Sequence, residues 1–236
     1  MNYHMPVMVK EILEYLCIVP GGSYVDCTLG GGGHSEEILK ALQGQGTLDS
    51  FDRDPEAIAH ATERLKEFIN FKCHHQAFST IAEALATASI DGILYDLGVS
   101  SHQLDKAERG FTFRADKKLD MRMNQESGDS AYDYLLAVSE DDLARCFKIN
   151  GDLKKSRLLS QEVKALVAVK HEEDIMPSDI KGIVEKLFRG QQRKHTDILA
   201  RIFQSIRMEV NEELHQIEES LHSLDDLMKP GGRVCI

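Results

Sequence analysis

Short apolar runs alternate with helical periods over residues 23–98, and this alternation constrains the fold more than any other feature of the chain. Pro55 suits the first turn of one of the helices. Strands that alternate with helices are joined by right-handed crossovers, so the sequence predicts an α/β fold built on a parallel sheet. The expected strands are 23–29, 47–52, 71–75 and 91–97, with helices near 35–42, 55–68 and 79–88.

The hydrophobic periodicity of the sequence changes after residue 98. Residues 98–130 show neither period, and a loop of this length inside a domain is usually functional. The alternative is a disordered surface segment, but Phe111, Phe113 and Met121 are too apolar for a simple linker. Helical periods follow at 131–137, 140–148, 156–170, 178–188 and 196–208, and the last helix is expected to run on with little break through 209–228. The run KPGG at 229–232 predicts a turn, and 233–236 begins a further strand, which predicts a C-terminally shortened chain.

Charge is distributed unevenly along the chain. The net charge is −11, which by itself argues against nucleic acid. Residues 145–207 nevertheless hold 14 Lys and Arg against 8 Asp and Glu. A basic segment in an acidic chain indicates one local anionic partner, and a solvated helical face explains the charge equally well.

The sequence contains no signal for a membrane, for secretion or for a cysteine-bound metal. No apolar run is long enough to span a membrane, and the first residues lack the features of a signal peptide. We therefore expect a cytoplasmic protein without a membrane partner. The cysteines form no CxxC pair, so neither a metal site nor a disulfide framework is expected; they are Cys17, Cys27, Cys73, Cys146 and Cys235.

A glycine cluster follows the first expected strand, in the run DCTLGGGGHS at 26–35. Glycines at this point let a ligand approach the backbone, and the next helix presents free N–H groups. Asp52, at the end of the second strand, can accept hydrogen bonds from both hydroxyls of a ribose. The pattern predicts a nucleoside-containing cofactor without separating NAD from S-adenosylmethionine, although Ser35 in place of a third glycine weakens the NAD interpretation.

Asp96 ends the fourth expected strand, within the run DLGVSS at 96–101. Ligands of open parallel sheets bind at the carboxyl ends of the strands. Asp96 would therefore face the same crevice as Gly32 and Asp52, although a simple strand-ending turn explains this run equally well.

Several longer stretches resemble the RsmH (MraW) family of S-adenosylmethionine-dependent methyltransferases, which act on the N4 atom of a cytidine in small-subunit ribosomal RNA. The similarity extends from HMPV at 4–7 to the last residue. Its most specific part is 91–124, and it also includes DCTLGGGGHS at 26–35, FDRDPEAI at 51–58, FQSIRMEVNEEL at 203–214 and KPGGRVCI at 229–236. The family continues beyond the point that matches Ile236, which again indicates a shortened chain.

The resemblance implies a fold and a set of site residues. It implies a Rossmann-like class I methyltransferase sheet at 1–107 and 209–236. It also implies a loop plus an inserted all-helical domain at 108–208 that recognises RNA. Gly32, Gly33 and His34 are expected to hold the methionine end of the cofactor, and Asp52 its ribose. Phe78 is expected to contact the adenine, and Asp96 and Gln103 to complete the cofactor site.

Asp96 is also the candidate catalytic residue, because an acceptor near the weakly nucleophilic cytosine amino group would take up charge as the methyl group moves. The expected substrate is small-subunit rRNA, free or in the assembled subunit. An open sheet edge after Ile236 favours a homo-oligomer. The alternatives are a non-catalytic binder of cofactor or ribosome and a nicotinamide-dependent oxidoreductase. The chain shows no Tyr-x-x-x-Lys pair for the latter.

Overall fold

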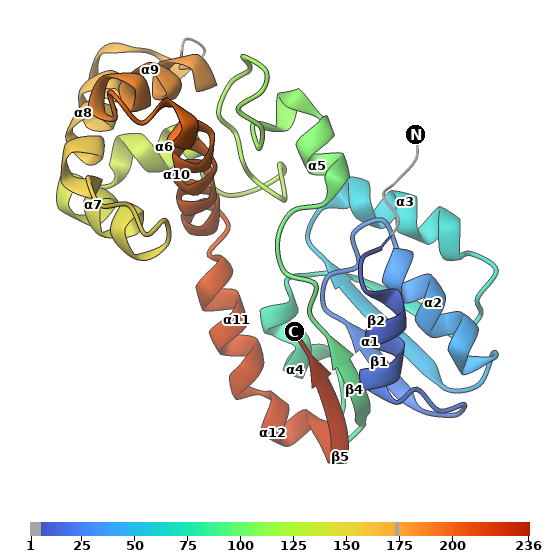
Figure 1. Ribbon diagram of the computed structural model, residues 1–236. Coiled ribbons are helices and arrows are strands. Elements are labelled where there is room, and N and C mark those ends of the chain that lie inside the picture. Colours follow the sequence, from blue (N-terminus) through green and yellow to red (C-terminus); the bar gives the residue numbers. More distant parts are fainter. Residues whose placement is uncertain (1–5, 173–174) are drawn as a thin grey trace. The chain divides into compact units, whose positions relative to one another are not determined.

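The computed structural model describes residues 6–172 and 175–236, which form two compact units (Figure 1). The first comprises the chain up to Ser101 together with Leu214–Ile236, and the second is His102–Glu213. The helical insertion predicted at 108–208 lies inside the second unit.

The first unit is built on a parallel sheet of five strands in the order β3-β2-β1-β4-β5. The predicted Rossmann-like α/β fold is therefore confirmed. Long crossover connections that contain helices join the strands, as parallel pairing requires. The strands are β1 (Ser23–Asp26), β2 (Thr47–Asp52), β3 (Phe71–His75), β4 (Ile90–Leu94) and β5 (Met228–Cys235).

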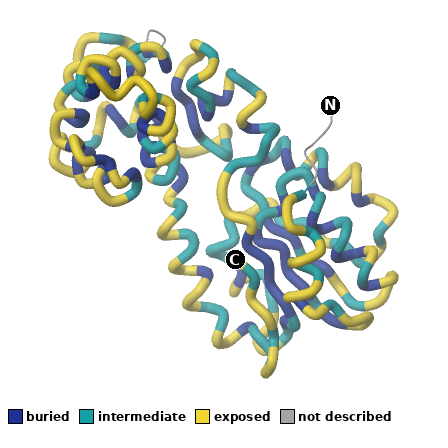
Figure 2. The backbone as a smooth tube through the Cα atoms, in the orientation of Figure 1, coloured by how far each residue is buried: buried dark blue, intermediate teal, exposed yellow. Residues whose placement is uncertain are grey.

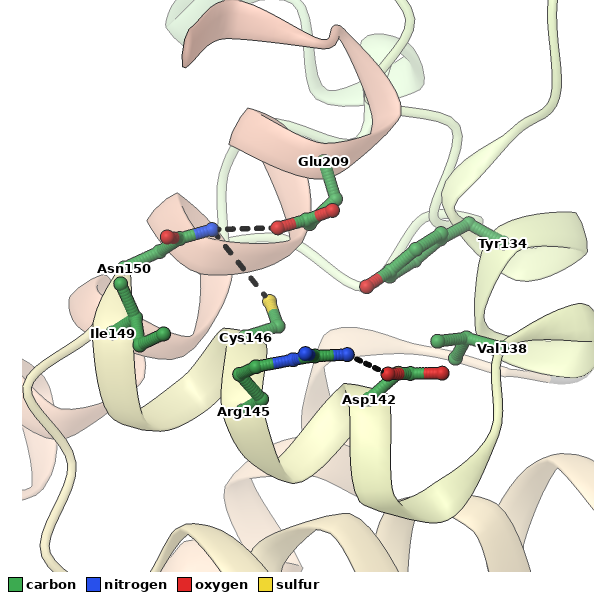
Figure 3. Close-up of a pocket in the computed structure, with 8 residues that line it drawn as sticks. All are labelled: Tyr134, Val138, Asp142, Arg145, Cys146, Ile149, Asn150 and Glu209. Atoms are coloured by element: carbon green, nitrogen blue, oxygen red, sulfur yellow. Dashed lines mark hydrogen bonds and ion pairs between the residues drawn. The ribbon is translucent and has the colours of Figure 1, made fainter. Parts of the chain in front are cut away.

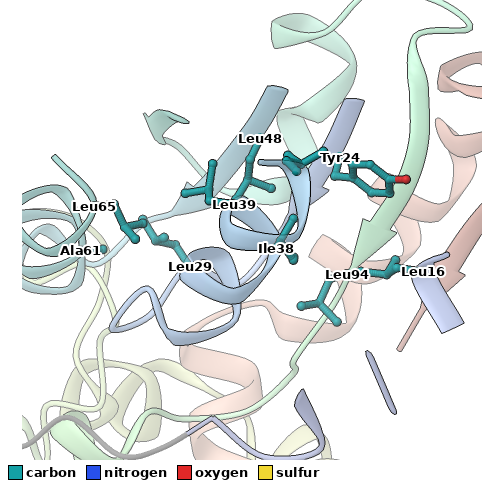
Figure 4. Packing of buried hydrophobic residues seen from close by; sticks show 10 residues of the cluster. Leu16, Tyr24, Leu29, Ile38, Leu39, Leu48, Ala61, Leu65 and Leu94 are labelled. Carbon is teal, nitrogen blue, oxygen red and sulfur yellow. The ribbon is translucent and has the colours of Figure 1, made fainter. Parts of the chain in front are cut away.

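Apolar side chains fill both faces of this sheet. On one face pack α1 (Val9–Leu16), α2 (Gly33–Leu42) and α3 (Pro55–Leu65), around the buried cluster shown in Figure 4. The other face packs Phe51 and Ile93 against the one-turn helices α4 (Ile81–Ala84) and α12 (Leu224–Leu227). The three central strands, β1, β2 and β4, are accordingly the most buried strands of this unit, whereas the edge strands β3 and β5 contain no fully buried residue (Figure 2).

Two strand boundaries and one turn differ from the prediction. β1 ends at Asp26 and β4 at Leu94, so the residues that follow are free to turn at the edge of the sheet. The predicted turn at 229–232 instead lies within β5. Gly231 takes a positive φ of 85°, and the pairing with β4 shifts between Ile90 and Gly92. A bulge of this kind absorbs extra residues without ending the strand.

Two helical predictions were wrong. The helix expected at 79–88 is reduced to the 3-10 turn η1 (Phe78–Thr80) and α4, because Leu85 is already extended. The long helix expected to continue through 228 breaks at Asn211 and Glu212. The Asn211 side chain bonds the backbone of Met121 and Met123, and Glu212 has a φ of 49°. Beyond this break the chain continues as α11 (Glu213–His222), before α12 and β5. The helix α1 was not predicted at all.

The second unit is helical, and its five main helices match the prediction to within one or two residues. Ser130 and Asp133 form a capping box at the start of α6, and Ser139 caps α7. The helices are α6 (Ala131–Ala137), α7 (Glu140–Ile149), α8 (Ser156–Val169), α9 (Pro177–Leu187) and α10 (His195–Val210), with the 3-10 turn η4 (Gln192–Lys194) before the last. No helix in the described part of the chain has the length and apolarity that crossing a membrane requires.

The stretch expected to be a long loop, 98–130, is largely irregular but anchored. It contains the short helix α5 (Ser101–Asp105) and the 3-10 turn η2 (Ala107–Arg109), neither of which was predicted. Arg109 is buried and donates to the carbonyls of Arg122 and Met123, at 3.1 and 2.9 Å. Leu119 and Met121 are buried as well. The apolar residues that argued against a disordered excursion therefore hold the loop to the helices.

Candidate functional site

The carboxyl edge of the sheet collects acidic and small residues from three adjacent strands. Asp26 ends β1, Asp52 ends β2, and Asp96 lies two residues after β4. The order of the strands places β1 between the other two, which explains why residues far apart in sequence meet here. This is the edge at which open parallel sheets bind ligands.

The glycine loop leads directly into the N-terminus of α2. Gly32 is the N-cap with a φ of 75°, a conformation that side chains disfavour, and no side chain caps the helix. The first N–H groups of a helix have no partner within the helix, and they carry partial positive charge. A Cβ atom on Gly33 would lie 3.0 Å from the Pro6 ring, so the N-terminal segment packs closely over this turn. The loop therefore offers free donors for an anionic group.

Asp52 is held in an acceptor-only arrangement. Its Oδ2 accepts from the backbone N–H of Gly30 at 2.8 Å, and its Oδ1 accepts from that of Asp54 at 2.9 Å. Burial raises the pKa of Asp52 to about 6, because removal from water disfavours the charged form, and the two N–H donors offset only part of that effect. The carboxylate joins the glycine loop to the end of β2, where the sequence predicted a ribose ligand.

Asp96 is positioned through its main chain. Its backbone N–H donates to Thr28 Oγ1 at 2.7 Å, and the Thr28 N–H donates to Asp26 Oδ1 at 3.0 Å. The Asp96 side chain is 48% exposed, with one oxygen 3.5 Å from His34 Nδ1. A half-exposed carboxylate with a fixed backbone can act on a group that arrives from solvent.

Asp26 organises the floor of the site from a fully buried position. Its Oδ2 accepts from Ser35 Oγ at 2.7 Å, and Ser35 lies 3.0 Å from Ser50 Oγ on β2. Burial raises the pKa of Asp26, while the hydrogen bonds from Ser35 and Thr28 oppose that rise. The sequence analysis gave Asp26 no role, although the spacing Asp26-x-Thr28 is typical of an Asx turn.

The remaining predicted site residues, His34, Phe78 and Gln103, differ in how they are held and in which unit they lie. Both ring nitrogens of His34 face protein groups, since Nε2 lies 2.8 Å from the Val7 carbonyl, so its backbone N–H is the part left for a ligand. Phe78 follows β3 and packs edge-on against Tyr95, with ring centroids 5.6 Å apart. Gln103 is buried on α5 in the second unit, so its role at the site stays a prediction.

Pro6 and Val7 are a part of the site that the sequence analysis missed. Pro6 covers Gly33, and the Val7 carbonyl bonds His34. Only the resemblance at 4–7 hinted at it, because a short segment without periodicity carries no signal of where it packs. No group of three metal-ligating side chains occurs among residues 6–172 and 175–236.

The second unit contains a separate pocket of about 300 Å³ between α6, α7 and α10 (Figure 3). Asn150 Nδ2 donates to Glu209 Oε1 at 2.8 Å, and Arg145 pairs with Asp142. Burial raises the pKa of the Cys146 thiol to about 12, so this thiol is not a nucleophile at neutral pH. We assign the pocket no catalytic chemistry. Its lining is Tyr134, Val138, Asp142, Arg145, Cys146, Ile149, Asn150 and Glu209.

Comparison with known proteins gives a match over the full chain. The family model described as the MraW methylase family matches residues 1–236. A protein of Fusobacterium nucleatum named ribosomal RNA small subunit methyltransferase H is 40% identical over 240 residues, which cover 100% of this chain and 75% of the relative. Proteins of the same name from Phocaeicola vulgatus and Christiangramia forsetii are 39% and 40% identical, over 99% and 100% of this chain and 75% and 76% of those relatives.

Similarity to solved structures is lower. A putative rRNA methylase from Clostridium thermocellum shares 18% identity over 42% of this chain and 53% of that one, with a TM-score of 0.36. That similarity is too low to support an inference about this chain.

Proposed function

Because the chain belongs to the MraW methylase family and is an S-adenosylmethionine-dependent methyltransferase, we propose that it methylates the N4 atom of a cytidine in small-subunit ribosomal RNA. One observation supports this proposal above the others. A glycine loop, a ribose-type carboxylate and a half-exposed carboxylate meet at one sheet edge, in a chain that matches the family over its whole length.

The residues at this edge fit the cofactor. The uncapped N-terminus of α2, from Gly33 onward, would hold the carboxylate of the methionine moiety with backbone N–H groups. Asp52 would accept hydrogen bonds from the ribose hydroxyls with its remaining lone pairs. Phe78 would contact the adenine ring. Space is available above the loop, since a Cβ atom on Gly30 would meet a single atom within 4 Å, at 3.8 Å.

Asp96 is the residue that we propose acts on the substrate amino group. S-adenosylmethionine, when bound, supplies a sulfonium methyl group that is already reactive. The chain therefore contributes mainly position and electrostatics. An Asp96 oxygen that accepts an N4–H hydrogen bond would orient the nitrogen lone pair toward the methyl group and take up the proton released as the N–C bond forms. The cytosine must be unpaired to reach this edge.

Substrate selection is proposed to lie with the second unit, whose helices carry the basic segment 145–207. A small-subunit rRNA substrate implies a cytoplasmic site of action. Self-association is a further proposal, supported by the position of β5 at the end of the sheet and by exposed Val234. Sedimentation at two protein concentrations would test it.

Transfer of labelled methyl groups to unmethylated small ribosomal subunits tests the proposed function. After digestion of the RNA, mass analysis should identify N4-methylcytidine as the labelled nucleoside. Label in another nucleoside, or in none, would contradict the proposed substrate.

The role of Asp96 is tested in the same assay. Asp96→Asn should lower the single-turnover rate by about 10²-fold, the lower end of what a positioned acid or base contributes. Asp225→Asn, an exposed position on α12, is the matched control and should leave the rate unchanged. An unaltered rate in Asp96→Asn would remove the acceptor role.

A further inference from the structure

The positive charge surplus of the second unit is concentrated in two short stretches. Residues 154–157 and 189–194 together hold six Lys and Arg and no Asp or Glu. The rest of the segment 145–207 holds eight cationic and eight acidic residues, and is therefore neutral. These ten residues thus account for the whole surplus.

Packing between α8 and α9 brings the two stretches together. Lys155 Nζ donates to the Leu187 carbonyl at 2.6 Å and lies 5.1 Å from the centre of the buried Phe188 ring. Glu162, further along α8, pairs with Lys186 at 2.7 Å, so the first half of α8 lies beside the end of α9. Both stretches therefore lie at the same end of this helix pair (Figure 1).

All six cations are exposed, and five of them remain once Lys155, which is bonded to the Leu187 carbonyl, is set aside. The set is Lys154, Arg157, Arg189, Arg193 and Lys194, here called the α8–α9 basic surface. None of these five has an ion-pair partner among the residues that the structure describes. The acids nearest in sequence, Asp152 and Asp197, are both bonded to Arg201, at 3.3 and 3.1 Å.

We propose that the α8–α9 basic surface binds the sugar–phosphate backbone of the RNA substrate, an inference that rests on the proposed function. Three of the five residues are arginines, whose planar guanidinium groups match phosphate oxygens in pairs. The chain as a whole carries −11, so a polyanion is repelled by most of its surface. A concentrated basic surface therefore both attracts the RNA and fixes which face it meets.

The test compares RNA binding by three versions of the full chain over a range of salt. The first variant is Arg189→Gln/Arg193→Gln/Lys194→Gln. The control removes three exposed cations elsewhere, Lys66→Gln/Lys148→Gln/Lys181→Gln. The ligand is an unmethylated small-subunit rRNA fragment at 50 to 200 mM KCl. Each phosphate contact contributes roughly 0.7–0.9 to the slope of log affinity against log salt, so the first variant should lose about 2 from that slope.

The expected affinity loss at 100 mM salt is on the order of tenfold for the first variant and under twofold for the control. S-adenosylhomocysteine binding and thermal unfolding should stay at wild-type values, because no hydrogen bond or ion pair joins these three side chains to another described residue. Arg189→Lys/Arg193→Lys keeps the charge and should restore the wild-type slope.

Two results would overturn the assignment. One is a slope in the glutamine variant equal to that of the control. The other is weakened binding to the assembled subunit with unchanged binding to naked RNA, which would identify a protein partner instead. The proposed function fails separately: a wild-type chain that binds RNA with the expected slopes but transfers no methyl group would contradict the activity and leave the basic surface standing.

Discussion

Cofactor affinity should fall as the pH drops through about 6, and Asp52 is the reason. Only the ionised carboxylate can accept from both ribose hydroxyls while it also accepts from Gly30 and Asp54. Burial raises the pKa of Asp52 to about 6. Below that pH most of the Asp52 carboxyl groups are protonated, and each must lose its proton before the cofactor binds. At pH 5 roughly one carboxyl in eleven is ionised, which weakens binding about tenfold, or about 1.4 kcal/mol, relative to pH 8.

Isothermal titration with S-adenosylhomocysteine at pH 5, 6, 7 and 8 measures this dependence. Asp52→Asn is the matched variant, because it keeps the shape of the side chain and cannot ionise. Its affinity should be lower by roughly 1.5–3 kcal/mol at pH 8, the value of hydrogen bonds to a charged group, and should lack the fall below pH 6 that Asp52 causes. Other groups titrate in this range, so the difference between the two proteins is the decisive quantity. Equal pH profiles in the wild type and the variant would refute the role of Asp52.

Two further predictions concern positioning and stability. Thr28→Val removes the acceptor for the Asp96 N–H without changing the shape of the side chain, and should lower the single-turnover rate at saturating cofactor about tenfold, the effect of roughly one hydrogen bond. Thr28→Ser keeps the hydroxyl and should restore the rate. A normal rate in Thr28→Val would show that Asp96 needs no such support. Lys164 donates to three carbonyls at the end of α6, at 2.7 to 2.9 Å, so Lys164→Met should lower the free energy of unfolding by about 2 kcal/mol in urea titrations. The exposed Lys181→Met is its control, and an equal loss in both would contradict the capping role.

The sheet and the helical unit were predictable because their signals are local and repeated. Alternating strands and helices over residues 23–98 admit few topologies, and the handedness of crossovers removes most of those. The failures occur where a single tertiary contact overrides the local pattern. The periodicity from 196 to 228 reads as one helix, yet Asn211 bonds the backbone of the loop at Met121 and Met123 and the helix ends there. A bond between positions about 90 residues apart leaves no trace in a helical period.

The candidate site divides in the same way. Asp52 and Asp96 could be placed at one edge because each follows a strand, and parallel strands end on the same side. The support beneath them could not be placed. Thr28 reaches Asp96 across a sequence separation of 68, and Pro6 covers the glycine turn from a segment without periodicity. Pairings of this kind depend on the finished sheet, so a sequence predicts the groups that carry the chemistry more readily than those that hold them.

Three carboxylates at one sheet edge have different tasks because their surroundings differ. Asp26 is fully buried, and its oxygens accept hydrogen bonds from Ser35 and Thr28, so its role is structural. Asp52 is half-buried and its oxygens have lone pairs free, which suits a neutral donor such as a ribose hydroxyl. Asp96 is half exposed, with its backbone N–H bonded to Thr28 and one side-chain oxygen 3.5 Å from His34 Nδ1, which leaves its other oxygen to meet the substrate. Together they favour a cationic ligand over a neutral one. Methyl transfer removes the sulfonium charge, so S-adenosylhomocysteine is bound less tightly than S-adenosylmethionine, which favours release of the product.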